Sequence, residues 1–199
     1  NRRHRPPFAE LTDRQIGATV SAMETTTALP KIISVDDHTV EPPDVWQNRL
    51  PKKYLDTGPR TVRAPLKEIS FLGGRFKPVM GAPGDDGPLG DWWLYEGLQR
   101  PLTRLDTAVG YSRDENKLEG ITYEQMRPGS YDVPARLADM DVNHVQSALC
   151  FPTFPRFCGQ TFTEAKDHEL GLLCVRAYND WMVEEWCGPQ AEGRLIPLT

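Results

Sequence analysis

Three short apolar runs, separated by helical patterns, most constrain the fold of this chain. The run IISV predicts a strand over residues 31–35, and VQSALCFP predicts a second strand over 145–152. A third apolar run, GRLIPLT, predicts another strand at 193–199. Nearly continuous apolar strands that alternate with helices are typical of a parallel sheet covered by helices. The sequence therefore predicts an α/β fold, either a doubly wound sheet or a (β/α)8 barrel.

Helical patterns precede the second and third strands. The segment SYDVPARLADMD predicts a short helix with Pro134 in its first turn. Thr161 and Glu164 have the spacing of a capping box, which predicts the start of a long amphipathic helix. Gly188 and Pro189 provide the stop signal for that helix.

Two segments fall outside this alternation. Residues 1–30 have the composition of an amino-terminal extension and linker, with a short helix predicted over 8–20. Residues 42–129 are rich in Gly and Pro without long periodic stretches, which predicts a long insertion after the first strand. Trp92 and Trp93 within the insertion are interpreted as core or subunit contacts, and alternatively as an apolar cap over a site.

Charge and composition exclude several classes of protein. The 199 residues carry a net charge of -5 with no Lys/Arg stripe, which argues against a nucleic-acid partner. No secretory signal is visible and no apolar run is long enough to cross a bilayer, so we expect a cytoplasmic protein. The four cysteines form no C-x-x-C pair and are interpreted as buried or unreactive thiols.

The first strand runs into the acidic sequence Asp36-Asp37-His38. On a strand, Asp36 and His38 share a face while Asp37 points to the other face. A carboxylate and an imidazole suit a divalent metal ion, with Glu41 as a weaker third candidate. On spacing alone an acidic turn is the better interpretation, because a single D-x-H pattern is short. No G-x-G-x-x-G follows the strand, which argues against a nucleotide-binding sheet.

Six separated segments carry a family resemblance: SVDDHTVEPPDVW, DWWLYEG, YEQMRPGSYD, RLADMD, CFPTFPRFCGQTF and AYNDWMVEEWCGPQAEGRLIPL. Together they resemble the amidohydrolase-related group of the amidohydrolase superfamily, close to aminocarboxymuconate semialdehyde decarboxylase, over residues 31–199. The resemblance implies the amino-terminal part of a metal-dependent (β/α)8 TIM barrel. It also implies hydrolysis or non-oxidative decarboxylation of a small carboxylated or cyclic organic substrate.

The same resemblance implies roles for the first strand. The family pattern D-x-H-x-H makes Asp36 and His38 ligands of one divalent ion, with zinc favoured over manganese or iron, whereas Val40 stands where a second histidine is expected. The catalytic base and the remaining ligands are expected from later strands. Because such a barrel needs about 250 residues, we expect those strands from the rest of the polypeptide or from a second chain, in an oligomer. The alternative is a non-catalytic scaffold or interaction subunit that keeps the barrel fold.

Three residues after the second strand are candidate substrate contacts. Phe151, Phe154 and Arg156 lie where the mouth of a barrel is expected, and the guanidinium suits a substrate carboxylate. The alternative is an aromatic loop that packs on the barrel rim with Arg156 in solvent.

Overall fold

The predicted strands form one parallel sheet in the computed structural model, which describes residues 29–199. The sheet order is β1-β6-β7, with β1 over Ile32–His38, β6 over Val145–Phe151 and β7 over Leu195–Pro197. Both pairings are parallel, as predicted, and β1 continues through His38 beyond the predicted end at residue 35. The predicted extension over 1–30, with its helix over 8–20, lies almost wholly outside the described residues.

The pairing of β1 with β6 is irregular at two places. Between Ile32 and Ile33 the extra residue is on β6, and between Ser34 and Asp37 it is on β1. Ser34 pairs with Ala148, and Asp37 pairs with Cys150, so three steps along β1 match two steps along β6. This is a β-bulge, which inserts one unpaired residue and changes the direction of the neighbouring side chains. Ala148 and Cys150 are both buried on one face of β6. Ser34 and Asp37 therefore share that buried face although they lie three positions apart.

Helix α2 precedes β6, as the sequence predicts. It spans Val133–Val142, with Pro134 in its first turn, and Met140 is buried against the core. The side chain of Asp132 caps it by accepting a hydrogen bond from the Ala135 backbone N–H at 3.0 Å. This contact satisfies one of the free N–H groups at the helix start.

The long helix before β7 starts later than predicted. A four-residue helix, α3 (Gln160–Thr163), ends before α4 (His168–Trp181), whose start is capped by Asp167. The predicted capping box is therefore wrong. The Thr161 hydroxyl instead donates to the Phe154 carbonyl at 2.8 Å, a tertiary contact that removes it from a capping role.

Helix α4 ends where the sequence predicts. It continues into one π-helical turn, Met182–Trp186, and the chain leaves the helix at Gly188. A Cβ at Gly188 would collide with the Glu184 carbonyl oxygen, so only glycine fits there. The remaining helical segments are short 3-10 turns: Lys52–Tyr54, Arg104–Thr107, Arg113–Glu115, Tyr123–Gln125, Pro128–Ser130, Phe157–Gly159 and Pro189–Ala191.

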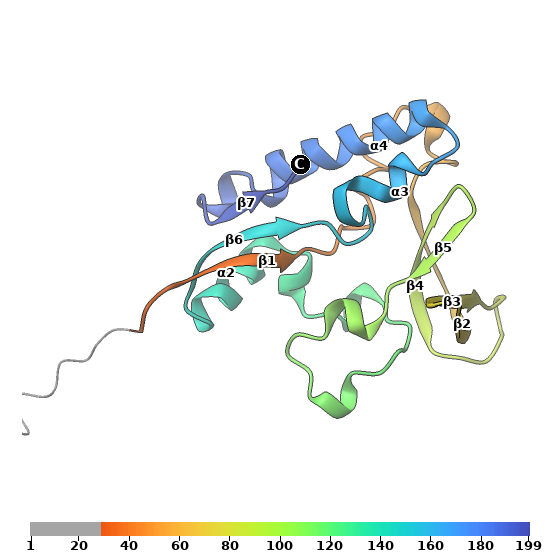
Figure 1. Cartoon of the computed structure of the whole chain (residues 1–199), viewed down its shortest axis with the longest axis horizontal. Coiled ribbons are helices and arrows are strands. Elements are labelled where there is room, and N and C mark those ends of the chain that lie inside the picture. The colour runs from red at the N-terminus through yellow and green to blue at the C-terminus, as the bar shows by residue number, and fades with distance from the viewer. Residues whose placement is uncertain (1–28) are drawn as a thin grey trace, which may run out of the picture. The chain divides into compact units, whose positions relative to one another are not determined.

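The insertion forms an antiparallel sheet that the sequence analysis did not predict. Its order is β3-β2-β4-β5, formed by β2 (Arg60–Leu72), β3 (Arg75–Met80), β4 (Leu89–Tyr95) and β5 (Leu98–Pro101). Prolines inside β2 and β3 and the many turn glycines obscure the strand pattern. Figure 1 shows this sheet beyond the carboxyl ends of β1 and β6, apart from the parallel strands.

An aromatic cluster joins the insertion to the parallel sheet. Trp46 packs edge-on against Trp93 with ring centroids 5.1 Å apart, and Phe154 stacks on Trp93 at 4.8 Å. The Trp46 indole N–H donates to the Cys174 carbonyl of α4 at 3.0 Å. Trp92 and Trp93 are both 0 % exposed, which confirms their interpretation as core residues.

The face of the parallel sheet opposite its buried side is open. Ile33, Val35 and Ile196 are 61 %, 68 % and 41 % exposed on the three-stranded sheet. Among the helices of residues 29–199, none has the length and apolar character needed to span a membrane. The described cysteines are free thiols; Cys150 and Cys174 are buried, Cys187 is half-buried and Cys158 is exposed.

Candidate metal and substrate site

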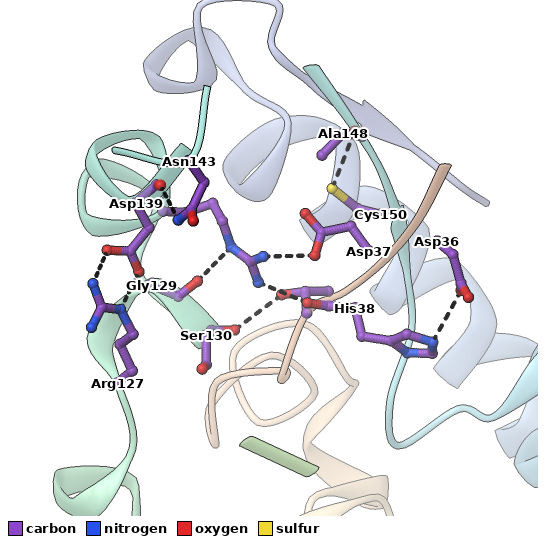
Figure 2. A network of polar contacts seen from close by, with 12 residues as sticks. Asp36, Asp37, His38, Arg127, Gly129, Ser130, Asp139, Asn143, Ala148 and Cys150 are labelled. Atoms are coloured by element: carbon purple, nitrogen blue, oxygen red, sulfur yellow. Dashed lines mark hydrogen bonds and ion pairs between the residues drawn. The ribbon is translucent and has the colours of Figure 1, made fainter. Parts of the chain in front are cut away.

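Asp36 and His38 converge at the carboxyl end of β1. The distance from Asp36 Oδ1 to His38 Nε2 is 3.7 Å, and their side chains are 85 % and 56 % exposed. Figure 2 shows the two side chains on one side of the strand and Asp37 on the other. The His38 ring also lies beside Phe151, its partner on β6, with ring centroids 5.7 Å apart. The first strand thus presents an accessible carboxylate and imidazole together.

The separation of these two donors suits a shared metal ion. Nitrogen and oxygen ligands bind zinc at about 2.1 Å, so two donors at a tetrahedral angle lie about 3.4 Å apart. The observed 3.7 Å requires only a small closing movement of exposed side chains. However, residues 29–199 contain no group of three or more His, Cys, Asp or Glu side chains placed to hold a metal ion. Within residues 29–199, Asp36 and His38 are therefore two candidate ligands without a third beside them.

Asp37 is held on the opposite face by Arg136 of α2. Arg136 Nη1 donates to Asp37 Oδ1 at 2.9 Å, and Nη2 donates to the His38 carbonyl at 2.7 Å. Arg136 Nε donates to the Gly129 carbonyl, so one guanidinium ties α2, the loop before it and the end of β1. Its side chain is 14 % exposed, which shields these contacts from water. Arg136 therefore fixes the backbone that carries His38.

Two residues that follow β1 are buried and cannot bind a metal ion at the surface. Val40, where the family resemblance expects a second histidine, is 2 % exposed in the core. Glu41 is 0 % exposed, and its two carboxylate oxygens accept the backbone N–H groups of Thr153 and Phe154, each at 2.9 Å. Burial raises the pKa of Glu41 to about 7 despite these hydrogen bonds. The interpretation of Glu41 as a third metal ligand is therefore wrong.

A large cavity opens at the carboxyl ends of β1 and β6. It has a volume of about 1320 Å³; His38 lines it from β1, and Thr153 and Arg156 line it from the loop after β6. Phe71 and Phe76, near the tip of the β2–β3 hairpin, line another part of it. Active sites of parallel α/β sheets lie at this end of the strands. The insertion thus contributes walls to the cavity as well as part of the core.

The three candidate substrate contacts have different surroundings. Arg156 lines the cavity and pairs with Glu164 at 3.3 Å. Phe151 is half-buried beside His38 on the sheet and does not line the cavity. Phe154 is 1 % exposed within the aromatic core. The geometry brings Arg156 and His38 to the same cavity and places Phe154 in the core.

Two arginines without a sequence signal hold the segments that carry the candidate site residues. Arg100 of β5 lines the cavity, donates to the Thr153 carbonyl at 2.7 Å and pairs with Asp106 at 3.2 Å. Arg136 holds the end of β1 from α2. Neither arginine belongs to a local motif, because each acts on a segment far away in the sequence. Finding them would have required the contacts of α2 with β1 and of β5 with the loop after β6.

Comparisons with known proteins agree with the architecture. No protein-family model and no curated protein matches the chain. A similar solved structure is an amidohydrolase from Mycobacterium avium subsp. paratuberculosis K-10, with a TM-score of 0.53 and 20 % sequence identity. The match covers 86 % of this chain and 42 % of that protein, so this chain spans less than half of its length. The chain therefore shares the fold of part of an amidohydrolase.

Proposed function

We propose that residues 31–199 are the amino-terminal part of a metal-dependent (β/α)8 enzyme of the amidohydrolase superfamily. The observation that carries this proposal is the convergence of Asp36 and His38 at the carboxyl end of β1, beside a large cavity. The parallel order β1-β6-β7 and the fold shared with an amidohydrolase support it. The enzyme would hydrolyse or non-oxidatively decarboxylate a small carboxylated or cyclic organic substrate.

Asp36 and His38 would together hold one divalent ion, with zinc favoured over manganese or iron. When bound, the ion would supply Lewis-acid activation of a carbonyl, carboxylate or water oxygen. His38 would bind through a neutral imidazole nitrogen, and Asp36 would offset part of the positive charge. Arg156 lies at the same cavity, where its guanidinium can bind a substrate carboxylate in place of Glu164.

Additional strands would complete the site. Ile33, Val35 and Ile196 expose an apolar face on the parallel sheet, which is costly unless other elements cover it. The rest of a longer polypeptide, or a second chain in an oligomer, would cover this face and provide the remaining ligands and the catalytic base.

Elemental analysis of the purified complete protein tests this proposal, together with native mass spectrometry to establish its assembly. We expect about one zinc, manganese or iron ion per site, lost in His38→Asn and reduced in Asp36→Asn. His144→Asn is the matched control, because His144 is exposed just before β6, at the opposite end of the strands. Asn also tolerates the left-handed backbone of His144, whose φ is 56°.

A folded, metal-free wild-type protein would contradict the enzyme proposal. It would support the second candidate, a non-catalytic scaffold or interaction subunit that retains the barrel fold. The specific observation in favour of that candidate is Val40, which occupies the core at the position where the family resemblance expects another ligand. Equal metal loss in His144→Asn would show that the metal binds through nonspecific surface histidines.

A further inference from the structure

The loop between β6 and α3 adopts an unfavourable backbone conformation beside the cavity. Arg156 has φ 63° and ψ -177°, a region occupied almost entirely by glycine. Cys158 follows with φ 53°, and Gly159 has φ 69°. Backbone strain of this kind persists only where surrounding contacts enforce it. The contacts at the beginning of this loop therefore help to hold Arg156 in its strained conformation beside the cavity.

Glu41 provides those contacts from the segment after β1. Its two carboxylate oxygens each accept one backbone N–H, from Thr153 and from Phe154, at 2.9 Å. The Thr153 hydroxyl returns a hydrogen bond to the Thr39 carbonyl at 2.7 Å, and the Thr39 N–H donates to the Phe151 carbonyl at 3.0 Å. The chain leaving β1 and the chain leaving β6 are thus hydrogen-bonded at several successive residues.

In the part of the chain that the structure describes, the side-chain oxygens of Glu41 form hydrogen bonds only with this loop. The residue is 0 % exposed, and within residues 29–199 its carboxylate forms no ion pair with a lysine or arginine side chain. The Tyr123 hydroxyl donates to the Glu41 backbone carbonyl at 2.6 Å and leaves both side-chain oxygens to the loop. A carboxylate that binds two adjacent backbone N–H groups selects one backbone conformation there.

We propose that Glu41 is a positioning residue of the cavity. By fixing the backbone of Thr153 and Phe154, it holds the strained loop so that Arg156 lines the same cavity as His38. This inference rests on the proposed function only in treating the cavity as the site. It gives Glu41 a role through backbone geometry, without contact with substrate or metal.

Amide hydrogen exchange of the full chain at pH 8, where Glu41 is ionised, tests the proposal with Glu41→Gln, resolved by residue in nuclear magnetic resonance spectra. Glutamine has the same length, but its NH2 group faces one of the two backbone N–H donors. We expect about ten- to hundredfold faster exchange at Thr153 and Phe154, with upfield shifts of both amide protons. Trypsin should also cut faster after Arg156, while exchange within α4 stays unchanged.

Asp91→Asn is the matched control. Asp91 is another buried carboxylate, 5 % exposed, and it accepts the Tyr123 backbone N–H at 2.9 Å. This variant should speed exchange at Tyr123 and leave Thr153 and Phe154 unchanged. If Glu41→Gln fails to fold, Glu41→Asp provides the test, because its carboxylate is one methylene shorter, weakens both backbone hydrogen bonds and should accelerate trypsin cleavage after Arg156.

Two outcomes would overturn the proposal. Unchanged exchange at Thr153 and Phe154 in Glu41→Gln would show that the carboxylate does not hold the loop. An equal increase throughout α4 would show that Glu41 stabilises the whole core and does not position one loop. For Glu41→Asp, an unchanged cleavage rate after Arg156 would also show that the carboxylate does not hold the loop. These measurements involve neither metal nor turnover. A result that contradicts the role of Glu41 can therefore be distinguished from one that contradicts the proposed metal site.

Discussion

At the scale of single residues, Arg136 carries more contacts than its position on a surface helix suggests. It binds the Asp37 carboxylate and the backbone carbonyls of Gly129 and His38. Three acceptors on two segments, the end of β1 and the loop before α2, therefore depend on one side chain. Removing a partner from a mostly buried ion pair leaves a charge without compensation, which costs more than the pair itself contributes.

We expect Arg136→Met to lower the free energy of unfolding by about 2 kcal/mol, because Asp37 and two carbonyls lose their donor. Urea denaturation followed by circular dichroism measures the change. Arg127→Met is the control: Arg127 binds Asp139 at 2.6 and 2.7 Å, but its side chain is 41 % exposed. Water screens that pair, so we expect a loss of about 1 kcal/mol or less. Equal losses in the two variants would contradict this ranking.

Glu41 gives the protein a specific dependence of stability on pH. Its pKa is about 7 in the folded state, against an ordinary value of 4.5. Between these values the folded state binds more protons than the unfolded state, so the free energy of unfolding falls as pH rises. The contribution is present in full below about pH 4.5 and is lost by about pH 7, and it amounts to about 3 kcal/mol.

Urea denaturation of wild type and Glu41→Gln at pH 5, 6, 7 and 8 measures this effect. Other carboxylates add their own slopes, but the difference between the two proteins isolates Glu41. We expect the advantage of wild type over the variant to shrink steadily from pH 5 to pH 8. A difference that is constant across this range would show that Glu41 does not titrate there.

At the scale of elements, the start of α4 distinguishes a local sequence signal from the structure that forms. Asp167 accepts the Leu170 N–H at 3.0 Å. Glu164, the residue chosen by the capping-box pattern, instead pairs with Arg156 at the surface. We expect Asp167→Ala to cost about 1 kcal/mol of unfolding free energy and Glu164→Ala to cost about 0.5 kcal/mol or less. Thermal denaturation of both variants checks the ranking. A larger loss of stability in Glu164→Ala than in Asp167→Ala would support the capping-box prediction.

The elements that could be predicted share one property: their apolar pattern is contained within the element. β1, β6 and β7 are compact apolar runs, and α2 has Pro134 in its first turn. The strands of the insertion lack such runs, because β2 contains Pro65 and β3 contains Pro78. Their pairing with one another, and not their composition, makes them strands.

The pairing register between elements could not be predicted from the sequence either. The bulge in β1 depends on which residues of β6 lie opposite. The start of α4 is capped by Asp167, while the Thr161 hydroxyl of the predicted capping box bonds the Phe154 carbonyl. For the site, the convergence of Asp36 and His38 follows from strand alternation. The support from Arg136 joins residues 99 positions apart in the sequence, so no local motif predicts it.

At the scale of the whole molecule, the aromatic cluster makes the insertion and the parallel sheet dependent on each other. Phe154 stacks on Trp93 of β4 and packs against Trp46, and all three are fully buried. The insertion is therefore packed into the main core. Loss of the cluster should affect both sheets together.

We expect Phe154→Ala to lower the free energy of unfolding by about 3 to 5 kcal/mol, because it leaves a cavity among packed rings. Tryptophan fluorescence and far-ultraviolet circular dichroism should report one shared transition for wild type, at the same urea concentration. Two separate transitions would show that the insertion unfolds independently. A stable Phe154→Ala protein with weakened substrate binding would instead place Phe154 at the site.

The bulge in β1 also determines how this strand tolerates insertions and deletions. Ser34 and Asp37 keep their partners on β6 while one residue between them remains unpaired. Deleting Val35 would therefore give regular pairing from Ile33 to His38, with Asp36 and His38 still on the open face. No unpaired residue lies between Asp37 and His38. An insertion there would therefore turn the imidazole toward the helices. We thus expect the candidate site to tolerate a one-residue deletion before Asp36, and we expect a one-residue insertion immediately after Asp37 to disrupt it.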